Sequence, residues 1–181
     1  MGNQYYLVSQ LPDVASSGEK QNLPITEEYF RDLCERFLDE KSLDILKNLT
    51  LVPPRKDVVT GSAFVDAWYE KERALRLALA QVRALNLQKE SEALNGACTG
   101  DVMQAARTAV GMDSPLSAEQ YLYQYRLDVI NQIAPLDQFS VDAVFAYGLK
   151  LMLTARMKLF NEEKGMSSYH TIYDRILGEN T

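Results

Sequence analysis

Hydrophobic residues recur at helical spacing over most of the chain. Between Thr26 and Asp39, apolar side chains fall every three or four residues, which is the period of a helix with one buried face. Thr26 is a favourable N-cap, and the two glutamates that follow it suit the positive end of the helix dipole. The pattern therefore predicts a half-buried helix from Thr26 to about Asp39, and a shorter helix that starts at Ser42.

Longer helices are predicted in the middle of the sequence. Residues 62–87 form one continuous helical pattern that mixes small and large residues on its inward side, which favours the close approach of a second helix. Asp101 caps a short helical pattern that stops at Gly111. A capping box at Ser117 and a cap at Ser140 predict two further helices.

The two ends of the chain carry less regular patterns. Residues 5–8 are tyrosines, a leucine and a valine, so a short extended segment is predicted there. At the other end, a helix from Ser168 is predicted to pack Ile172, Tyr173 and Ile176 against the rest of the protein.

These elements define an all-α fold. No strand-rich run alternates with the helices, so a parallel sheet has nothing to be built from. The prediction is an irregular bundle of about seven helices, with two long antiparallel helices and a short extended N-terminal segment. A chain of 181 residues can bury one sizeable core. One domain is therefore predicted over 1–181, with an N-terminal segment of two short helices (1–60) and a main bundle (61–181).

Charge and composition narrow the class of protein. The net charge of -6 argues against a nucleic-acid-binding domain, which shows phosphate a basic face. No window approaches the roughly 20 apolar residues of a membrane span. The first residues lack the regions of a signal peptide. We expect a cytoplasmic protein, with membrane contact only through partners at the cytoplasmic face.

Few residue types for catalysis or metal binding stand at useful spacings. The single histidine, His170, has no Cys or carboxylate at ligand spacing, and the glycines match no phosphate loop. Cys34 lies on an apolar helix face, which indicates a buried free thiol, although a disulfide with Cys98 stays possible. We expect no catalytic, cofactor-binding or metal-binding residues. An enzyme whose polar residues come from scattered positions remains the alternative.

A row of arginines on the long helix is the first candidate interaction site. Arg76 and Arg83 are seven residues apart and share one face, with Arg73 nearby. Such a stripe suits an acidic partner. The alternative is a solvated helix face that is balanced by Glu70 and Glu72.

Two more positions follow from the helical periodicity. Arg156 falls within the apolar face of its helix, where a buried arginine needs a carboxylate or carbonyl partner. A structural ion pair is expected, with Asp128 as one candidate. Tyr123 lies between two inward tyrosines, Tyr121 and Tyr125, and is predicted to be an exposed aromatic anchor.

Two stretches of the sequence resemble a known family. The first is YYLVSQLP at residues 5–12, followed by LPITEEYF at residues 23–30. The second is FSVDAVFAYGLKL at residues 139–151, with Arg156 and residues 160–165 after it. They resemble an uncharacterised bacterial family that is encoded with the subunits of V/A-type (vacuolar/archaeal-type) rotary ATPases, in the place of the C (d) subunit.

The resemblance implies a role in coupling rather than catalysis. The C (d) subunit is a helical adaptor between the central stalk and the membrane ring, although this chain is shorter and lacks its threefold repeat. The leading hypothesis is a non-catalytic accessory subunit of a V/A-type ATPase whose partners are stalk or membrane-ring subunits. The alternative is a free-standing helical interaction or regulatory module unrelated to the ATPase.

Overall fold

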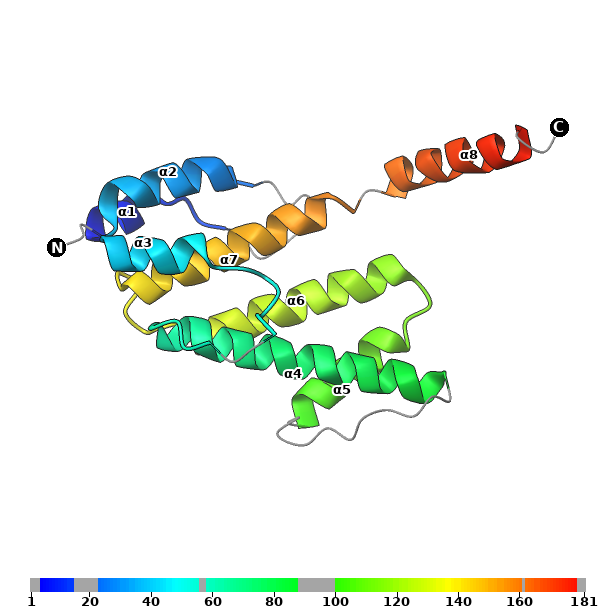
Figure 1. Cartoon of the computed structure of the whole chain (residues 1–181), viewed down its shortest axis with the longest axis horizontal. Helices are drawn as coiled ribbons and strands as arrows, with labels where there is room; N and C mark the ends of the chain where they lie inside the picture. The colour runs from blue at the N-terminus through cyan, green and yellow to red at the C-terminus, as the bar shows by residue number, and fades with distance from the viewer. Residues whose placement is uncertain (1–3, 15–22, 56–57, 88–99, 161, 179–181) are drawn as a thin grey trace.

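The computed structural model describes residues 4–14, 23–55, 58–87, 100–160 and 162–178, except for the side chains of residues 162–164. Over these ranges the secondary structure is eight α-helices without a strand, so the all-α prediction is confirmed (Figure 1). The helices are α1 (Gln4–Gln10), α2 (Glu27–Phe37), α3 (Glu40–Lys47), α4 (Ala63–Asn86), α5 (Gly100–Val110), α6 (Pro115–Ile133), α7 (Val141–Lys158) and α8 (Glu162–Gly178).

The N-terminal segment is helical rather than extended, and it forms α1. Leu7 is fully buried. The ring of Tyr5 lies 5.7 Å from that of Phe139, and the ring of Tyr6 lies 5.4 Å from that of Phe37. The tyrosines of this segment favour a strand by local propensity, but that preference is weak. Packing against distant residues overrides it, and the segment forms a helix.

Side-chain caps determine where three of the helices begin, as the sequence predicts. Thr26, Ser62 and Ser140 each accept a hydrogen bond from the backbone N–H three residues later, at 3.1–3.2 Å. Each bond satisfies one of the N–H groups that the first turn of a helix leaves without a partner. The starts of α2, α4 and α7 are therefore encoded locally.

Two other helices begin earlier than predicted. Asp39, not Ser42, caps α3, and the backbone N–H of Ser42 donates to the Asp39 carboxylate. Ser114, not Ser117, caps α6, with Pro115 in its first turn. Proline suits that position because it lacks the N–H that would otherwise go unpaired there.

Two hydrophobic clusters fill the bundle, and α4 passes through both. The larger cluster joins α1, α2, α3 and α7 to the first part of α4 and to α6. The smaller cluster joins the second part of α4 to α5 and α6. Its alanines let these helices approach closely: Ala78, Ala105, Ala106 and Ala109. Residues before and after position 60 belong to the same larger cluster, so the packing shows no domain boundary at that position.

The helices α4 and α7 run parallel, and α6 runs antiparallel to them (Figure 1). The hydroxyl of Ser62, at the start of α4, donates to the carboxylate of Asp142, in the first turn of α7, at 2.7 Å. The end of α7 meets the start of α6, where Arg156 pairs with Glu119. This arrangement brings side chains of three helices together near the end of α7.

A glycine allows α2 to pack directly on α7. A Cβ atom on Gly148 would lie 3.0 Å from Cε1 of Phe30, which is closer than nine in ten real Cβ contacts. The Phe30 ring also lies 5.4 Å from the ring of Tyr147. The contact between these two helices therefore depends on the missing side chain at position 148.

Candidate functional site

A buried carboxylate holds two arginines from different helices. Glu72 of α4 is 2% exposed and accepts hydrogen bonds from Nε and Nη2 of Arg126 on α6, at 2.9 and 3.0 Å. It also accepts one from Nε of Arg76, one turn later on α4, at 2.8 Å. Burial of an isolated charge is costly. A substitution that removes Glu72 or Arg126 would therefore leave the other residue buried without its main counter-charge and destabilise the fold.

A pocket of about 270 Å³ lies beside this ion-pair cluster, between α4, α6 and α7. Four arginines line it: Arg76, Arg83, Arg126 and Arg156. Glu119 also lines it and pairs with Arg156 at 3.1 Å. We call this site the arginine pocket. Among the described residues, Arg83 has no ion-pair partner.

The structure thus unites three of the arginines that the sequence singles out, and it separates the fourth. Arg76, Arg83 and Arg156 all line the arginine pocket. Arg73 does not, because its guanidinium donates to the carbonyl oxygen of Pro54 at 3.3 Å, in the segment before α4. An acidic partner for these side chains stays a prediction.

Sequence reasoning missed the buried pair of Glu72 and Arg126. Glu72 does not balance a solvated face, because it occupies a core position four residues after Trp68 and three before Leu75. Arg126 follows Leu122 by four residues, again on a buried face. The sequence does contain a signal for this pair. Glu72 and Arg126 carry opposite charges, and each stands at a position where the helical pattern calls for an apolar residue.

Arg156 forms an ion pair, as expected, but the candidate partner Asp128 is wrong. Arg156 pairs with Glu119 instead, and its guanidinium lies 5.8 Å from the ring centre of Phe160. Asp128 is exposed and accepts a hydrogen bond from Gln124 on its own helix, at 3.1 Å. The antiparallel arrangement explains the difference, because the end of α7 reaches the start of α6 and not its second half.

Tyr123 is a core residue and not an exposed anchor. Its side chain is 6% exposed, and its hydroxyl lies 3.0 Å from the Thr154 hydroxyl of α7. The helix α6 packs against α4 and α5 as well as against α7, so its buried surface is broader than a single stripe. A periodicity argument that assumes one buried face therefore misplaces Tyr123.

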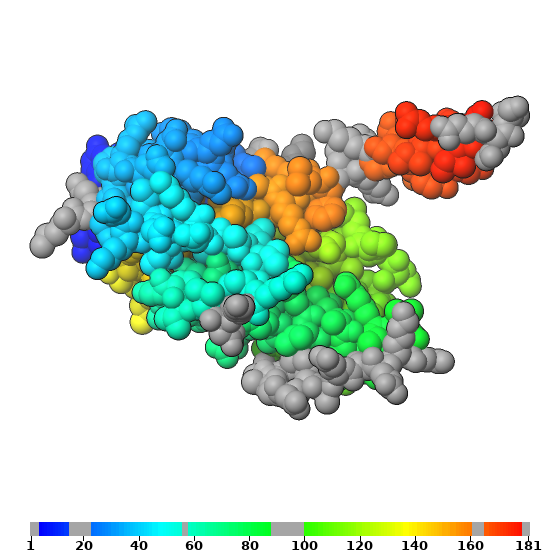
Figure 2. Space-filling view, in the orientation of Figure 1, coloured from blue at the N-terminus to red at the C-terminus, as the bar shows by residue number. Residues whose placement is uncertain are grey.

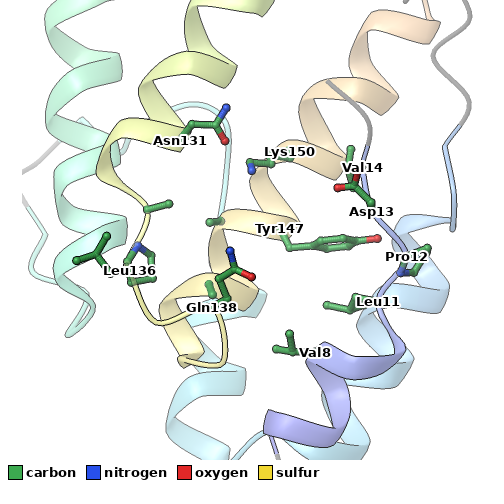
Figure 3. Close-up of a pocket in the computed structure, with 14 residues that line it drawn as sticks. Val8, Leu11, Pro12, Asp13, Val14, Asn131, Leu136, Gln138, Tyr147 and Lys150 are labelled. Carbon is green, nitrogen blue, oxygen red and sulfur yellow. The ribbon is translucent and has the colours of Figure 1, made fainter. Parts of the chain in front are cut away.

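A second pocket, of about 600 Å³, lies where α1 meets α7 and the segment that joins α6 to α7 (Figure 3). Figure 3 shows Tyr147 extended toward Asp13 and Pro12, whereas Lys150 extends toward Asn131. The Tyr147 hydroxyl is buried and has no hydrogen-bond partner in the described part of the chain. These polar groups point apart, whereas a catalytic constellation has side chains that converge on one reacting atom.

Burial sets the protonation of two side chains in this second pocket. It raises the pKa of the Tyr147 hydroxyl to about 12, and the negative charge of Asp13 adds to the effect. It lowers the pKa of the Lys150 ammonium, and there Asp13 acts in the opposite direction. Tyr147 is therefore a neutral hydrogen-bonding group at ordinary pH.

The last helix, α8, projects away from the bundle (Figures 1 and 2). It begins at Glu162 rather than at Ser168, and the prediction that it packs its apolar residues is wrong. Ile172 is 60% exposed, and every described side chain of α8 is exposed. Its apolar residues lie on one side: Met166, Tyr169, Ile172, Tyr173 and Ile176. The chain leaves the bundle after α7, so no described helix is close enough to cover that side.

The remaining sequence candidates have plain structural roles. Cys34 is buried and free, and Cys98 lies outside the described residues. His170 is exposed on α8, with its ring 5.8 Å from that of Tyr169.

In the described ranges, no group of three His, Cys, Asp or Glu side chains is placed to hold a metal ion. None of the described helices has the length and apolar character needed to cross a membrane.

Comparison with protein-family models, with curated proteins and with solved structures gave no match to this chain.

Proposed function

We propose that this protein is a non-catalytic coupling subunit that binds central-stalk or membrane-ring subunits of a V/A-type rotary ATPase. The exposed apolar side of α8 is the contact surface in this proposal, and the bundle formed by α1–α7 is the body that it connects. The protein would lie at the cytoplasmic face of the membrane and reach the membrane only through its partners.

The observation that carries the proposal is the exposure of α8. Met166, Tyr169, Ile172 and Tyr173 are each 49–60% exposed, and they lie on one side of the helix. An isolated helix of this length is marginal in water, and most helical stability in proteins comes from packing of an amphipathic face. Contiguous exposed apolar residues of this kind mark sites of protein interaction. An amphipathic helix laid into a groove of a partner is a common form of such binding.

The polar side of α8 supports binding by one face only. Ser167, Thr171, Asp174 and Arg175 lie opposite the apolar residues. A helix that is buried all round would carry apolar residues there as well. We therefore expect the partner to cover the apolar side and to leave the polar side in water.

The resemblance to the ATPase-associated family supplies the identity of the partner. Its two stretches come from opposite ends of the sequence, and they pack together. Tyr5 contacts Phe139, and Phe30 contacts Tyr147 and position 148. The residues that carry the resemblance thus lie together where α1 and α2 pack on α7 and on the segment before it.

The test is a pull-down of the full-length tagged protein from membranes of cells that encode it. The variant carries Ile172→Asp and Tyr173→Asp, which place charge on the apolar side of α8. The control carries Ser167→Asp and Thr171→Asp, which add the same charge to the polar side. We expect stalk or membrane-ring subunits with the wild type and the control, and their loss with the variant.

Two results would argue against the proposal in different ways. If none of the three proteins recovers an ATPase subunit, the partner is wrong and the free-standing interaction module becomes the better hypothesis. If all three recover ATPase subunits equally, the ATPase partner stands and α8 is not its contact. Self-association through α8 would appear as a dimer of the wild type in sedimentation, lost only in the apolar-side variant.

A further inference from the structure

The arginine pocket contains more positive charge than its own carboxylates neutralise. Arg76, Arg83, Arg126 and Arg156 line it, and a guanidinium group stays protonated in proteins. Glu72 and Glu119 are the carboxylates that pair with these arginines. Within the described residues this leaves an excess of two positive charges around one pocket.

The arginines also have unused hydrogen-bond donors. Each guanidinium has five N–H groups. Arg76 uses Nε on Glu72, and Arg126 uses Nε and Nη2 on the same carboxylate. The terminal nitrogens of Arg76 and the whole guanidinium of Arg83 meet no acceptor in the part of the chain that the structure describes. Both side chains line the pocket, and they lie two turns apart on α4.

We propose that the arginine pocket binds a phosphate-class oxyanion, either a phosphate or a diphosphate group. Arginine forks match the oxygen geometry of phosphate and form charge-assisted hydrogen bonds with it. A phosphate group is divalent near neutral pH, so it offsets the excess of two charges, whereas one carboxylate offsets only half of it. Its several oxygens also accept bonds from more than one arginine at a time.

The size of the pocket and the fixed position of Arg126 favour a small anionic group. At about 270 Å³, the pocket is below the roughly 300–1,000 Å³ that is usual for whole small-molecule ligands. Arg126 is 7% exposed and is held by two bonds to Glu72, so one wall is ordered before a ligand arrives. Preorganisation of this kind reduces the entropy lost on binding.

The site is independent of the proposed ATPase contact. The pocket lies within the bundle, between α4, α6 and α7, and none of its lining residues belongs to α8. Anion binding is therefore measurable on the purified full-length protein without any partner, and its failure would not bear on the proposed partner.

The experiment is calorimetric titration of the full-length protein with sodium pyrophosphate at constant ionic strength. The test variant is Arg83→Gln, because Arg83 is exposed, has no ion-pair partner among the described residues, and is not needed to hold Glu72. Arg36→Gln, at the exposed end of α2, is the matched control that loses the same charge elsewhere. Equal thermal melting of the three proteins verifies that they fold alike.

We expect saturable one-site binding by the wild type and by Arg36→Gln. We expect about tenfold or more weaker binding by Arg83→Gln, because charged hydrogen bonds contribute strongly to affinity. Arg83→Lys keeps the charge but not the fork, so it should restore only part of the affinity. A second titration with ADP distinguishes the sources: equal affinity indicates recognition of the diphosphate alone, and tighter binding indicates a nucleotide end group.

Three results would overturn the proposal. They are absence of saturable binding by the wild type, an equal loss of affinity in Arg83→Gln and Arg36→Gln, and displacement of pyrophosphate by a glutamate-rich peptide at lower concentration than by ADP. The last result would make the pocket a site for acidic side chains of a protein partner.

Discussion

The helices α7 and α8 have similar lengths, 18 and 17 residues, but opposite surroundings. Nine residues of α7 are buried, whereas every described side chain of α8 is exposed. The helix α7 packs against α2, α4 and α6. The helix α8 has the more regular separation of an apolar and a polar side. Regular amphipathicity thus indicates which side of a helix will be covered, but not whether the same chain covers it.

The difference predicts how each helix contributes to the protein. The side chains of α7 hold the bundle together, so changes there affect folding. The described side chains of α8 are exposed, so changes there should affect binding and leave the stability of the bundle unchanged. Paired substitutions in the bundle and in α8 test this division directly.

The largest expected contrast is between Phe145 of α7 and Ile172 of α8. Phe145 is 1% exposed, so Phe145→Ala should lower the free energy of unfolding by about 3–5 kcal/mol. Ile172→Ala should change it by less than about 0.5 kcal/mol. Urea denaturation followed by circular dichroism measures both. Equal losses would mean that α8 packs on the bundle in solution.

Charged residues of the bundle and of α8 should also differ in their contribution to stability. Arg126→Gln leaves the buried Glu72 with only Arg76 as partner and should cost about 3 kcal/mol of stability. Arg175→Gln, on the exposed polar side of α8, should cost less than about 0.5 kcal/mol. The double variant Glu72→Gln with Arg126→Gln should be less destabilised than the sum of the two single variants. Simple additivity in denaturation midpoints would contradict the buried pair.

Replacing a glycine by alanine should destabilise α7 but stabilise α8. Gly148→Ala places a Cβ atom 3.0 Å from Phe30 and should destabilise the bundle by about 1–3 kcal/mol. Gly165→Ala meets nothing within 4 Å in α8 and should favour helix there by roughly 0.5–1 kcal/mol. Denaturation measures the first effect, and amide hydrogen exchange along α8 measures the second. Destabilisation by both would remove the distinction between the helices.

The last effect appears only at alkaline pH and concerns the bundle alone. Burial raises the pKa of the Cys34 thiol from 9.0 to about 12, so the folded state favours the neutral thiol. This stabilisation is complete below pH 9 and is lost as the pH rises from 9 towards 12, at up to about 1.4 kcal/mol per pH unit. Stability curves between pH 8 and pH 11 should be flatter for Cys34→Ala. Identical slopes for the two proteins would show that the thiol does not titrate in this way.

Local signals in the sequence predict helices α2 to α7, but not α1, whose residues pack against distant parts of the chain. Caps at Thr26, Ser62 and Ser140 set three helix starts, because a cap depends only on residues within one turn. The all-α class follows from the same short-range patterns. What the sequence left open was the number of neighbours that each helix would have.

The errors share that cause. A single buried face on α6 would expose Tyr123, but α6 has three neighbouring helices and Tyr123 is buried. An apolar stripe predicts a buried Ile172 only if the same chain supplies a neighbouring helix, and Ile172 is exposed. The partner of Arg156 depended on helix directions, which no local pattern contains. Glu72 and Arg126 were within reach, since charged residues at core positions of two patterns need each other.

The hydrogen bond between Ser62 and Asp142 has a consequence for the order of events during synthesis. It joins residues that are 80 positions apart, and it links the first turns of α4 and α7. At roughly 5–20 residues per second, a ribosome needs about 4–16 s to add the intervening chain. During that interval α4 exists without its parallel neighbour, and its apolar side chains are open to chaperones. The nascent bundle therefore becomes complete only when α7 has left the exit tunnel.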